Sequence, residues 1–459
     1  MAGSRHAARA QAILTRRQPG AATSRNSQPC LSLAFRFSLS CRPVSHPEGP
    51  RSLANLTLFR ALRRQPFALL WTGQSLSRLG DFVYEIALAW WVLQKTGSAP
   101  TMSLVLIFAI TPSVLFSLVG GVTVDHVSRI GLMLASDVAR GLVARTVAVL
   151  GFAGRLVVWQ VFAASLIFGF VDAFFQPAYA ALVPQIVPPN DLPSANSLTS
   201  LSQNLGRVAG PALGAALVAV VGPPAAFAVN ALSFALSSVL LVPLLRAAVP
   251  RPAQPGGPLQ PWRDLREGFA TVLGSPWLWV TILVLSLTNV TLAGPYSIAM
   301  PFLVKDSLKA DVGTLGLLYA VFPLGYIFGG VWLGRYARIR RRGLVMYVST
   351  ALAALMLGLF GLLPPLWVLI AAALINGAAL EAGHLVWTNS LQSLVPNEQL
   401  GRVVSIDSLG SFGLLPIGLA LTGWATERIG PPAVFIIGGL VTAAVALAAL
   451  AHPGIRQYD

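Results

Sequence analysis

Charged residues are scarce in this chain of 459 residues. Asp, Glu, Lys and Arg together make up 10% of the sequence, whereas hydrophobic residues make up 55% and the mean hydropathy is +0.70. A soluble protein of this length carries roughly 25% charged residues. Because a soluble fold needs a wettable surface, this deficit excludes a large water-soluble globule.

Cysteine and the residue patterns of enzymes are also nearly absent. The two cysteines, Cys30 and Cys41, lie close to the N-terminus, so the sequence contains neither a disulfide framework nor a metal-ligand spacing. It has no GxSxG, HExxH or CxxC pattern and no GxxxxGK[ST] phosphate loop. We therefore expect no catalytic residues, no metal, no cofactor and no ATP-driven step.

The few charges are mostly positive, with a formal net charge of +16. On a soluble protein this balance would suggest nucleic acid as a partner. Here the arginines stand between apolar runs, and no basic patch is interleaved with base-stacking aromatic residues. The pattern predicts loop charges of a membrane protein and no nucleic-acid partner.

What the sequence has in place of charge is a series of apolar runs. Each is about 20 residues long, enough for a helix to cross roughly 30 Å of hydrocarbon. Transmembrane β-strands would alternate polar and apolar residues, which these runs do not. The expected fold class is therefore an all-α membrane protein with twelve transmembrane helices. The predicted spans are 69–93, 103–124, 132–152, 156–178, 197–220, 225–245, 277–300, 313–334, 344–363, 366–390, 404–426 and 432–451.

Composition divides the chain further. Residues 1–55 are rich in Arg, Ser and Pro, hold no acidic residue before Glu48 and lack the apolar core of a secretory signal. Their composition resembles an organellar transit peptide, and we expect a disordered extension or a mis-assigned start. The remaining expected parts are a six-helix bundle at 56–245, a cytoplasmic linker with an amphipathic helix at 246–276, a second bundle at 277–452 and a cytoplasmic tail at 453–459.

The distribution of Arg and Lys among the loops predicts the orientation of the chain. If the segment before the first span lies inside, the inner loops collect fifteen of these residues and the outer loops five. We therefore expect both termini in the cytoplasm and the protein in the inner membrane of the cell.

Three short segments occur twice, in the same order. GGVTVDHVSR (120–129) recurs as GGVWLGRYAR (329–338), ALVPQIVPPNDL (181–192) as SLVPNEQL (393–400), and GPPAAF (222–227) as GPPAVF (430–435). The offsets are similar, and each pair falls at an equivalent place in the two halves. Internal repeats of this kind are typical of secondary transporters. They predict a duplicated six-helix unit whose two copies are parallel.

Two six-helix halves, a central linker and a charged loop after the second span together resemble the major facilitator superfamily, over about residues 57–452. LRRQPFALLWTGQSLSRLGD (62–81) and LQSLVPNEQLGRVVS (391–405) resemble its drug-exporter branch, which includes macrolide and enterobactin exporters. GRVAGPALGAAL resembles the fifth-helix signature of antiporters in this family. That signature falls on Arg207, Gly210, Pro211 and Gly214.

The loop signature of the same family falls on Gly121, Asp125 and Arg129. We expect these residues to form an inner gate together with Asp137 and Arg140, which lie nearby in the third span; a static pair at the helix end is the alternative. The sequence departs from the family pattern because His126 follows Asp125, and because the second copy has Gly334 where the first has Asp125.

Charged residues inside the predicted spans are candidate functional residues, because each costs about 2.5–3.5 kcal/mol or more in hydrocarbon. Arg78, Asp81 and Glu85 share one face of the first span, at spacings of three and four residues. Glu381 and His384 are three residues apart in the tenth. We expect these five to line a proton-coupling site or a substrate cavity. Fixed structural pairs are the alternative at both places.

These observations predict a secondary active transporter that exports lipophilic small molecules of the drug, macrolide or siderophore class, coupled to protons, by alternating access. An importer or facilitator of a nutrient or lipid is the alternative. A membrane scaffold or sensor is disfavoured, since it gains nothing from the cost of intramembrane acids. The expected partners are the lipophilic substrate, protons and the lipid bilayer, and the chain is expected to act as a monomer.

Overall fold

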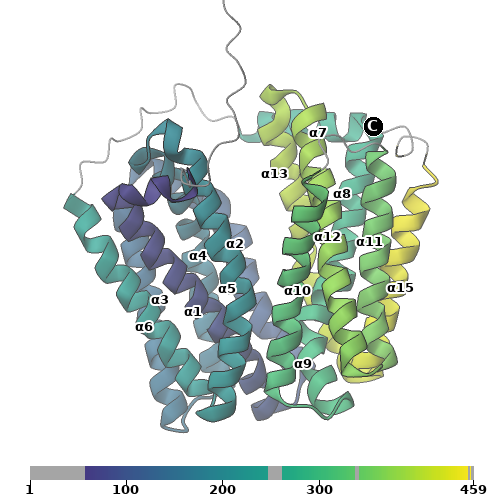
Figure 1. Ribbon diagram of the computed structural model, residues 1–459, viewed down its shortest axis with the longest axis horizontal. Coiled ribbons are helices and arrows are strands. Elements are labelled where there is room, and N and C mark those ends of the chain that lie inside the picture. Colours follow the sequence, from purple (N-terminus) through teal and green to yellow (C-terminus); the bar gives the residue numbers. More distant parts are fainter. Residues whose placement is uncertain (1–56, 247–260, 336–340, 453–454, 456–459) are drawn as a thin grey trace, which may run out of the picture. The chain divides into compact units, whose positions relative to one another are not determined.

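Helices make up nearly all of the chain that the computed structural model describes (Figure 1). The described residues are 57–246, 261–335, 341–452 and Ile455, and they contain no strand. The predicted extension at 1–55 lies outside the described residues, as do the first part of the linker and most of the tail.

Six long helices form the N-terminal bundle. They are α1 (Gln65–Thr96), α2 (Ala99–His126), α3 (Arg129–Phe152), α4 (Val158–Ile186), α5 (Leu192–Val220) and α6 (Pro223–Leu241). Three short 3-10 helices accompany them: η1 (Thr57–Arg63), η2 (Pro189–Asp191) and η3 (Val242–Arg246). Within this bundle α1 packs against α5 and α6, α2 against α4, and α3 against α4 and α6.

The C-terminal bundle follows a separate helix, α7 (Pro261–Gly274). Its members are α8 (Pro276–Thr288), α10 (Val312–Leu333), α11 (Arg342–Gly358) with η7 (Leu359–Leu362), α12 (Leu366–Leu394), α13 (Asn397–Gly413), α14 (Leu415–Ile429) and α15 (Pro431–Ala449). Its packing repeats that of the first bundle: α10 lies on α12 as α2 lies on α4, and α11 lies on α15 as α3 lies on α6.

Two of the predicted spans are less regular than the sequence suggested. The seventh continues beyond α8 through three π-helical turns, η4 (Asn289–Ala293), η5 (Pro295–Ala299) and η6 (Leu303–Ser307), with the short α9 (Met300–Phe302) before the last. The eleventh is broken at Leu414 between α13 and α14. Pro416 begins the second piece, where a residue without a backbone N–H is tolerated in the first helical turn.

Polar side chains at the loops define several helix ends. Ser98 accepts the backbone N–H of Thr101 at the start of α2, and Ser128 caps α3 in the same way. At the start of α10, Asp311 accepts the backbone N–H of Thr314 at 3.0 Å. This bond favours the charged form and holds the pKa of the exposed Asp311 carboxyl below its usual value.

Nine helical segments of the described chain are long and apolar enough to cross a membrane. The other three predicted spans fall on α1, α3 and α5, which are helical but more polar. The all-α membrane fold is therefore confirmed, and each of the twelve predicted spans coincides with a helical segment. Several polar residues of α1 and α3, among them Gln74, Asp137 and Arg140, are buried inside the N-terminal bundle.

The two bundles contact each other mainly through α5 with α10 and α2 with α14. At the first contact a Cβ on Gly316 would lie 2.8 Å from the backbone oxygen of Pro211. At the second, a Cβ on Gly423 would lie 3.0 Å from the backbone oxygen of Ala99. Both approaches therefore require glycine, because any side chain would force the helices apart.

A buried ion pair ties the segment before α1 to the α4–α5 connection. The Asp191 side chain, 3% exposed, forms ion pairs in which its carboxylate oxygens lie 2.7 Å from Arg60 Nε and 3.5 Å from Arg64 Nε. The backbone N–H of Ala61 also donates to Ser194 Oγ at 3.0 Å. Both arginine side chains are about half exposed, so the buried partner is the carboxylate.

Removing both arginines should therefore cost more stability than removing the acid. In Arg60→Ala/Arg64→Ala the Asp191 carboxylate stays buried without a partner, and we expect a loss of about 3 kcal/mol. In Asp191→Asn the two arginines turn toward water, and the loss is smaller. Thermal unfolding of the purified protein in detergent measures both. Arg63→Ala, an exposed neighbour, is the control; equal melting temperatures for the double variant and this control would contradict the assignment.

Candidate functional site

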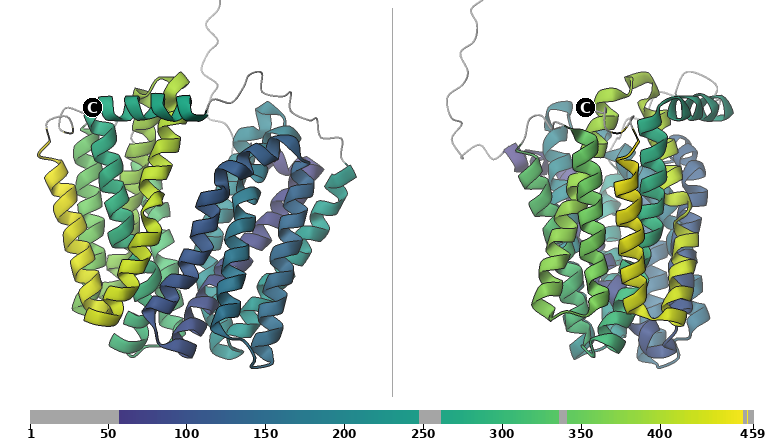
Figure 2. Two further views of the ribbon diagram at one scale, coloured as in Figure 1. Left: turned by 180° about the vertical axis from the view of Figure 1, so that it is seen from behind. Right: turned by 90° about the vertical axis from the view of Figure 1, so that its right-hand side faces the viewer.

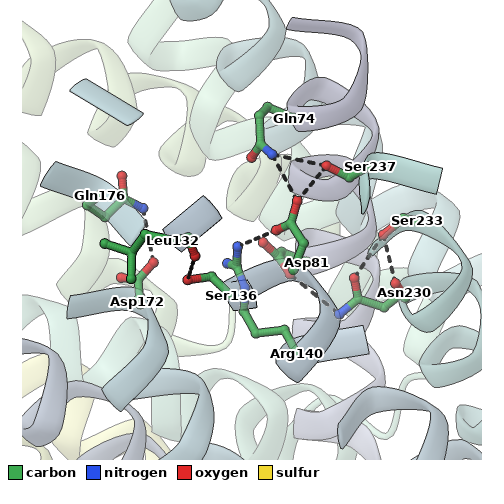
Figure 3. Close-up of polar contacts among 11 residues, drawn as sticks. Gln74, Asp81, Leu132, Ser136, Arg140, Asp172, Gln176, Asn230, Ser233 and Ser237 are labelled. Atoms are coloured by element: carbon green, nitrogen blue, oxygen red, sulfur yellow. Dashed lines mark hydrogen bonds and ion pairs between the residues drawn. The ribbon is translucent and has the colours of Figure 1, made fainter. Parts of the chain in front are cut away.

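A buried ion pair lies at the centre of the N-terminal bundle (Figure 3). Arg140 donates to Asp137 Oδ1 at 2.8 Å, and their side chains are only 4% and 0% exposed. The other carboxylate oxygen accepts from Ser237 Oγ at 2.6 Å and from Gln74 Nε2 at 3.1 Å. Gln74 also donates to Ser237 at 3.0 Å. Side chains from α1, α3 and α6 thus share one carboxylate.

Aromatic rings cover the guanidinium of this pair. The Arg140 Cζ atom lies 4.3 Å from the centroid of the Phe175 ring and 4.7 Å from that of Phe234. Ring faces attract a cation, and they do so more strongly where water is excluded. Two further hydrogen bonds to the carboxylate and two aromatic faces over the cation therefore stabilise the Asp137–Arg140 ion pair, and a buried pair requires such support.

Asp81 lies beside this pair on α1. Asn230 Nδ2 donates to Asp81 Oδ1 at 3.4 Å, and Ser233 Oγ in turn donates to the backbone oxygen of Asn230 at 2.8 Å. Arg140 and Arg78 both interact electrostatically with Asp81. Gly80 allows this arrangement, because a Cβ there would lie 2.7 Å from Asn230 Oδ1. The close approach of α1 and α6 brings the polar groups together.

Asp172 on α4 lies near the same cluster (Figure 3). Gln176 donates to its Oδ1 at 3.1 Å, and Ser113 of α2 is 3.5 Å from its other oxygen. Asp172 also interacts electrostatically with Asp81. Asp137 and Asp81 therefore both interact with the Arg140 guanidinium, and Asp172 of α4 interacts in turn with Asp81.

Arg78 borders a small polar hollow between α1, α4 and α5. Its guanidinium lies 5.9 Å from the Phe175 ring centroid, and among the described residues it makes no ion pair. Across the hollow the hydroxyls of Tyr179 and Thr199 are 3.0 Å apart. The residues around the hollow are Gln74, Ser75, Arg78, Phe175, Tyr179, Thr199, Ser202 and Gln203. The hollow is only about 10 Å³ in volume, so it admits a group about the size of a water molecule, to which these residues can donate and accept hydrogen bonds.

A second charged group involves both bundles. Glu85 of α1 and Arg207 of α5 are both exposed rather than packed in the bundle interior. Arg207 interacts electrostatically with Glu85 and also with Glu381 of α12. His384 Nδ1 lies 3.8 Å from Glu381 Oε2. One cation of the N-terminal bundle therefore acts on an acid of each bundle.

Aromatic residues of the C-terminal bundle lie near this group. Tyr319 donates to the backbone oxygen of Tyr296 at 2.8 Å, and their ring centroids are 4.8 Å apart. The ring of Phe322 lies 4.7 Å from that of Tyr296. Glu85 interacts electrostatically with both tyrosines, so the acid of α1 faces an aromatic wall on the other bundle.

The residues predicted for the inner gate are only partly described. The side chains of Gly121 and Asp125 lie outside the described set, and Arg129 donates to the backbone oxygen of Ala181 on α4 at 2.9 Å. Asp137 and Arg140 were expected beside the Asp125 loop. The contacts that the structure describes for them are instead with α1, α4 and α6. The gate assignment stays a prediction.

The fifth-helix signature serves close packing in this structure. A Cβ on Gly214 would lie 2.9 Å from the backbone oxygen of Val83 on α1, and one on Gly210 would clash with Phe82. The Pro211 oxygen lies at the contact with α10 described above. The signature thus lets α5 lie against α1 and α10 together, and Arg207 stands one turn before it.

Sequence reasoning missed the uncharged partners Gln74, Asn230 and Ser237. A weak signal existed, because Asn230, Ser233 and Ser237 follow one another at spacings of three and four within the apolar α6. Such spacing places them on one face. It did not indicate which charged helix that face would meet.

An apolar groove of about 540 Å³ lies between α1, α5 and α6. Its walls include Leu76, Leu213 and Leu232, and its polar lining is limited to Ser233. Leu213 and Leu232 are exposed residues of segments on the outer side of the bundle. The groove therefore suits hydrocarbon, and the polar cluster lies behind its Gly80 and Ser233 floor.

Comparisons with known proteins bear on the family and the fold. A family model described as "Transmembrane secretion effector" matches residues 56–457. Macrolide efflux protein A of Streptococcus pyogenes is 25% identical over 397 residues, 86% of this chain and 97% of that protein. Enterobactin exporter EntS of Shigella boydii serotype 18 is 31% identical over 343 residues, 71% of this chain and 78% of that protein.

Solved structures show the same fold at lower identity. A bacterial homologue of the iron transporter ferroportin, in an inward-facing state, gives a TM-score of 0.67 at 15% identity, covering 84% of this chain and 99% of that one. The nucleoside transporter NupG gives 0.62 at 14% identity, covering 86% and 100%.

A double-mutant cycle can test whether Asp137 and Arg140 stabilise the fold as a pair. Asp137→Leu leaves the Arg140 cation buried without its carboxylate, and we expect a loss of about 3–5 kcal/mol in unfolding free energy. Asp137→Leu/Arg140→Met removes both charges and should recover most of that loss. Thermal unfolding in detergent measures the cycle, with Arg145→Met, an exposed arginine of α3, as control. Additive losses in the double variant would show that the two residues do not depend on each other.

Proposed function

Since the chain belongs to the transmembrane secretion effector family of the major facilitator superfamily, and is thus a multi-pass membrane transporter, we propose that it is a proton-coupled exporter of lipophilic small molecules. The observation that carries this proposal is the charged group shared by the bundles, in which Arg207 acts on both Glu85 and Glu381. Transport by alternating access needs such a connection between halves that move against each other.

Proton coupling follows from the cost of the intramembrane acids. An unpaired carboxylate in a membrane interior is expensive, whereas a protonated one is not. When a proton neutralises Glu85, Arg207 interacts with Glu381 alone, and the reverse holds when Glu381 is protonated. Protonation therefore changes which bundle arrangement is favoured, and a bound proton and a bound substrate become linked through that equilibrium.

Asp81 supplies a third acid to the proposed pathway. It lies next to Arg140 and Arg78 and holds only one described hydrogen bond, the long one from Asn230. Asp137, by contrast, accepts three short ones. We therefore assign the proton-binding role to Asp81, Glu85 and Glu381, and a fixed structural role to the Asp137–Arg140 pair.

The substrate is proposed to be a lipophilic molecule that also carries polar groups. The edge-to-face rings of Tyr296, Tyr319 and Phe322 offer an aromatic wall, and the hollow beside Arg78 offers hydrogen bonds. The relatives named above export a macrolide and enterobactin respectively, according to their names.

The proposed location is the inner membrane, with both termini in the cytoplasm and the chain acting as a monomer. The arginines at the α7 end of the bundles support this orientation. They include Arg60, Arg63, Arg64, Arg129, Arg335 and Arg342.

Uptake of a fluorescent lipophilic cation or macrolide into inverted vesicles tests both the coupling to protons and the direction of transport. We expect uptake that needs an imposed proton gradient and collapses when a protonophore is added. Uptake that the protonophore leaves unchanged would exclude proton antiport. Uptake only into right-side-out vesicles would favour an importer of the same fold.

Substitution of the three acids tests the site. Asp81→Asn, Glu85→Gln and Glu381→Gln should each lower uptake by about tenfold, a typical coupling between two binding sites. Asp306→Asn, an exposed acid in η6, should transport normally and is the matched control. If all three variants match that control at equal expression, the assignment is wrong even though the transporter class stands.

A further inference from the structure

We propose that α7 is a membrane-surface helix whose exposed edge inserts into the headgroup region of an anionic phospholipid leaflet. The lipid edge of α7 consists of Phe269 and Leu273, bordered by Arg266. The proposal needs only that α8 begins a membrane span. It does not depend on what the protein transports or on how transport is coupled.

The chain geometry fixes α7 at the end of a span. α7 ends at Gly274 and α8 begins at Pro276, so Ser275 alone separates them. Ser275 has an extended backbone conformation, with φ −120° and ψ 100°, which turns the chain sharply. The segment Pro276–Ser307 is long and apolar enough to cross the bilayer. Figure 2 shows α7 lying across the ends of the neighbouring helices, so it cannot lie far from the surface of that bilayer.

Among the side chains of α7 that the structure describes, Arg266 and residues 268–274, the protein covers one side. Gly268 is buried and Val272 is 4% exposed. Thr271 Oγ1 donates to Gln399 Oε1 of α13 at 3.3 Å. This side therefore attaches α7 to the C-terminal bundle.

The apolar sector of α7 is wider than the part that the bundle covers. Phe269 is 44% exposed and Leu273 67% exposed, although both adjoin the buried Val272. At about 100° per residue, Phe269 and Leu273 lie about 40° apart, and Phe269 lies about 60° from Val272. A helix lying in the membrane interface has such a second apolar edge, which meets the acyl chains rather than the protein.

The charge beside this edge selects the kind of lipid. Arg266 is exposed and falls between Leu273 and the polar side of the helix. A long arginine stem can lie along apolar surface while its guanidinium reaches phosphate groups. Anionic headgroups attract such cations at the cytoplasmic face. A lipid surface is favoured over a protein partner, because the edge adjoins the first residues of a membrane span.

Site-directed fluorescence on the full chain tests the proposal. Cys30 and Cys41, the only cysteines, are replaced by Ser, and single cysteines are introduced as Phe269→Cys, Leu273→Cys and Ala270→Cys. Each is labelled with an environment-sensitive dye and reconstituted into phosphatidylcholine vesicles with or without phosphatidylglycerol. Ala270 is exposed like Phe269. Around the helix it lies about 100° from Phe269, about 60° from Leu273 and about 160° from the buried Val272.

The dyes at 269 and 273 should emit at shorter wavelength than the dye at 270 and be quenched by lipids that carry a nitroxide near the headgroup. The dye at 270 should be quenched by iodide in the water. Phosphatidylglycerol should strengthen the lipid quenching, and Arg266→Gln should remove that gain.

Three results would overturn the proposal. The first is iodide quenching at 269 and 273 equal to that at 270. The second is shielding from iodide without lipid quenching, which would place another protein on the edge. The third is lipid quenching that phosphatidylglycerol does not change, which would exclude an anionic surface. Native thermal stability of each labelled variant in detergent confirms that the comparison is made on folded protein.

Discussion

A charge within hydrocarbon needs a partner, and the N-terminal bundle is organised by this need. Arg140 on α3 reaches Asp137 on its own helix, and that carboxylate then holds side chains of α1 and α6. The rings of Phe175 and Phe234 close over the cation from α4 and α6. Four helices thereby share one ion pair. Separating α1, α4 or α6 from α3 would remove a hydrogen bond or an aromatic ring from the buried pair, which favours movement of this half as a unit.

The charged residues that lie between the two bundles are not enclosed in this way. Glu85 and Arg207 are exposed, and the groups that act on them include residues of the other bundle. Gly316 and Gly423 let the backbones of the two bundles approach closely, with the small side chains of Ala215 and Ser103 fitting against them. A rigid half with a paired interior, meeting its neighbour through small residues and adjustable charges, is suited to rocking motion.

The sequence predicted the helices well because hydrophobic length alone defines a membrane span. It predicted the charged residues of the site because they are costly and few. It did not predict the break before Pro416 or the π-helical turns after α8, since a span identified by average hydropathy conceals local geometry. Nor did it predict that Asn230 would meet Asp81. Uncharged polar residues are common in membrane helices, and their partners depend on how the helices rotate against one another.

The three π-helical turns after α8 have a consequence for how the seventh span presents its side chains. A turn closed by an i→i+5 bond holds more residues than an α-turn. Each such turn therefore rotates every later side chain relative to the pattern that α8 began. By Tyr296, within the second of these turns, the helix has changed phase, and its ring meets Tyr319 and Phe322. The first part of the span and its later π-helical part therefore present different faces to their neighbours, and the later part places the Tyr296 ring against the rings of α10.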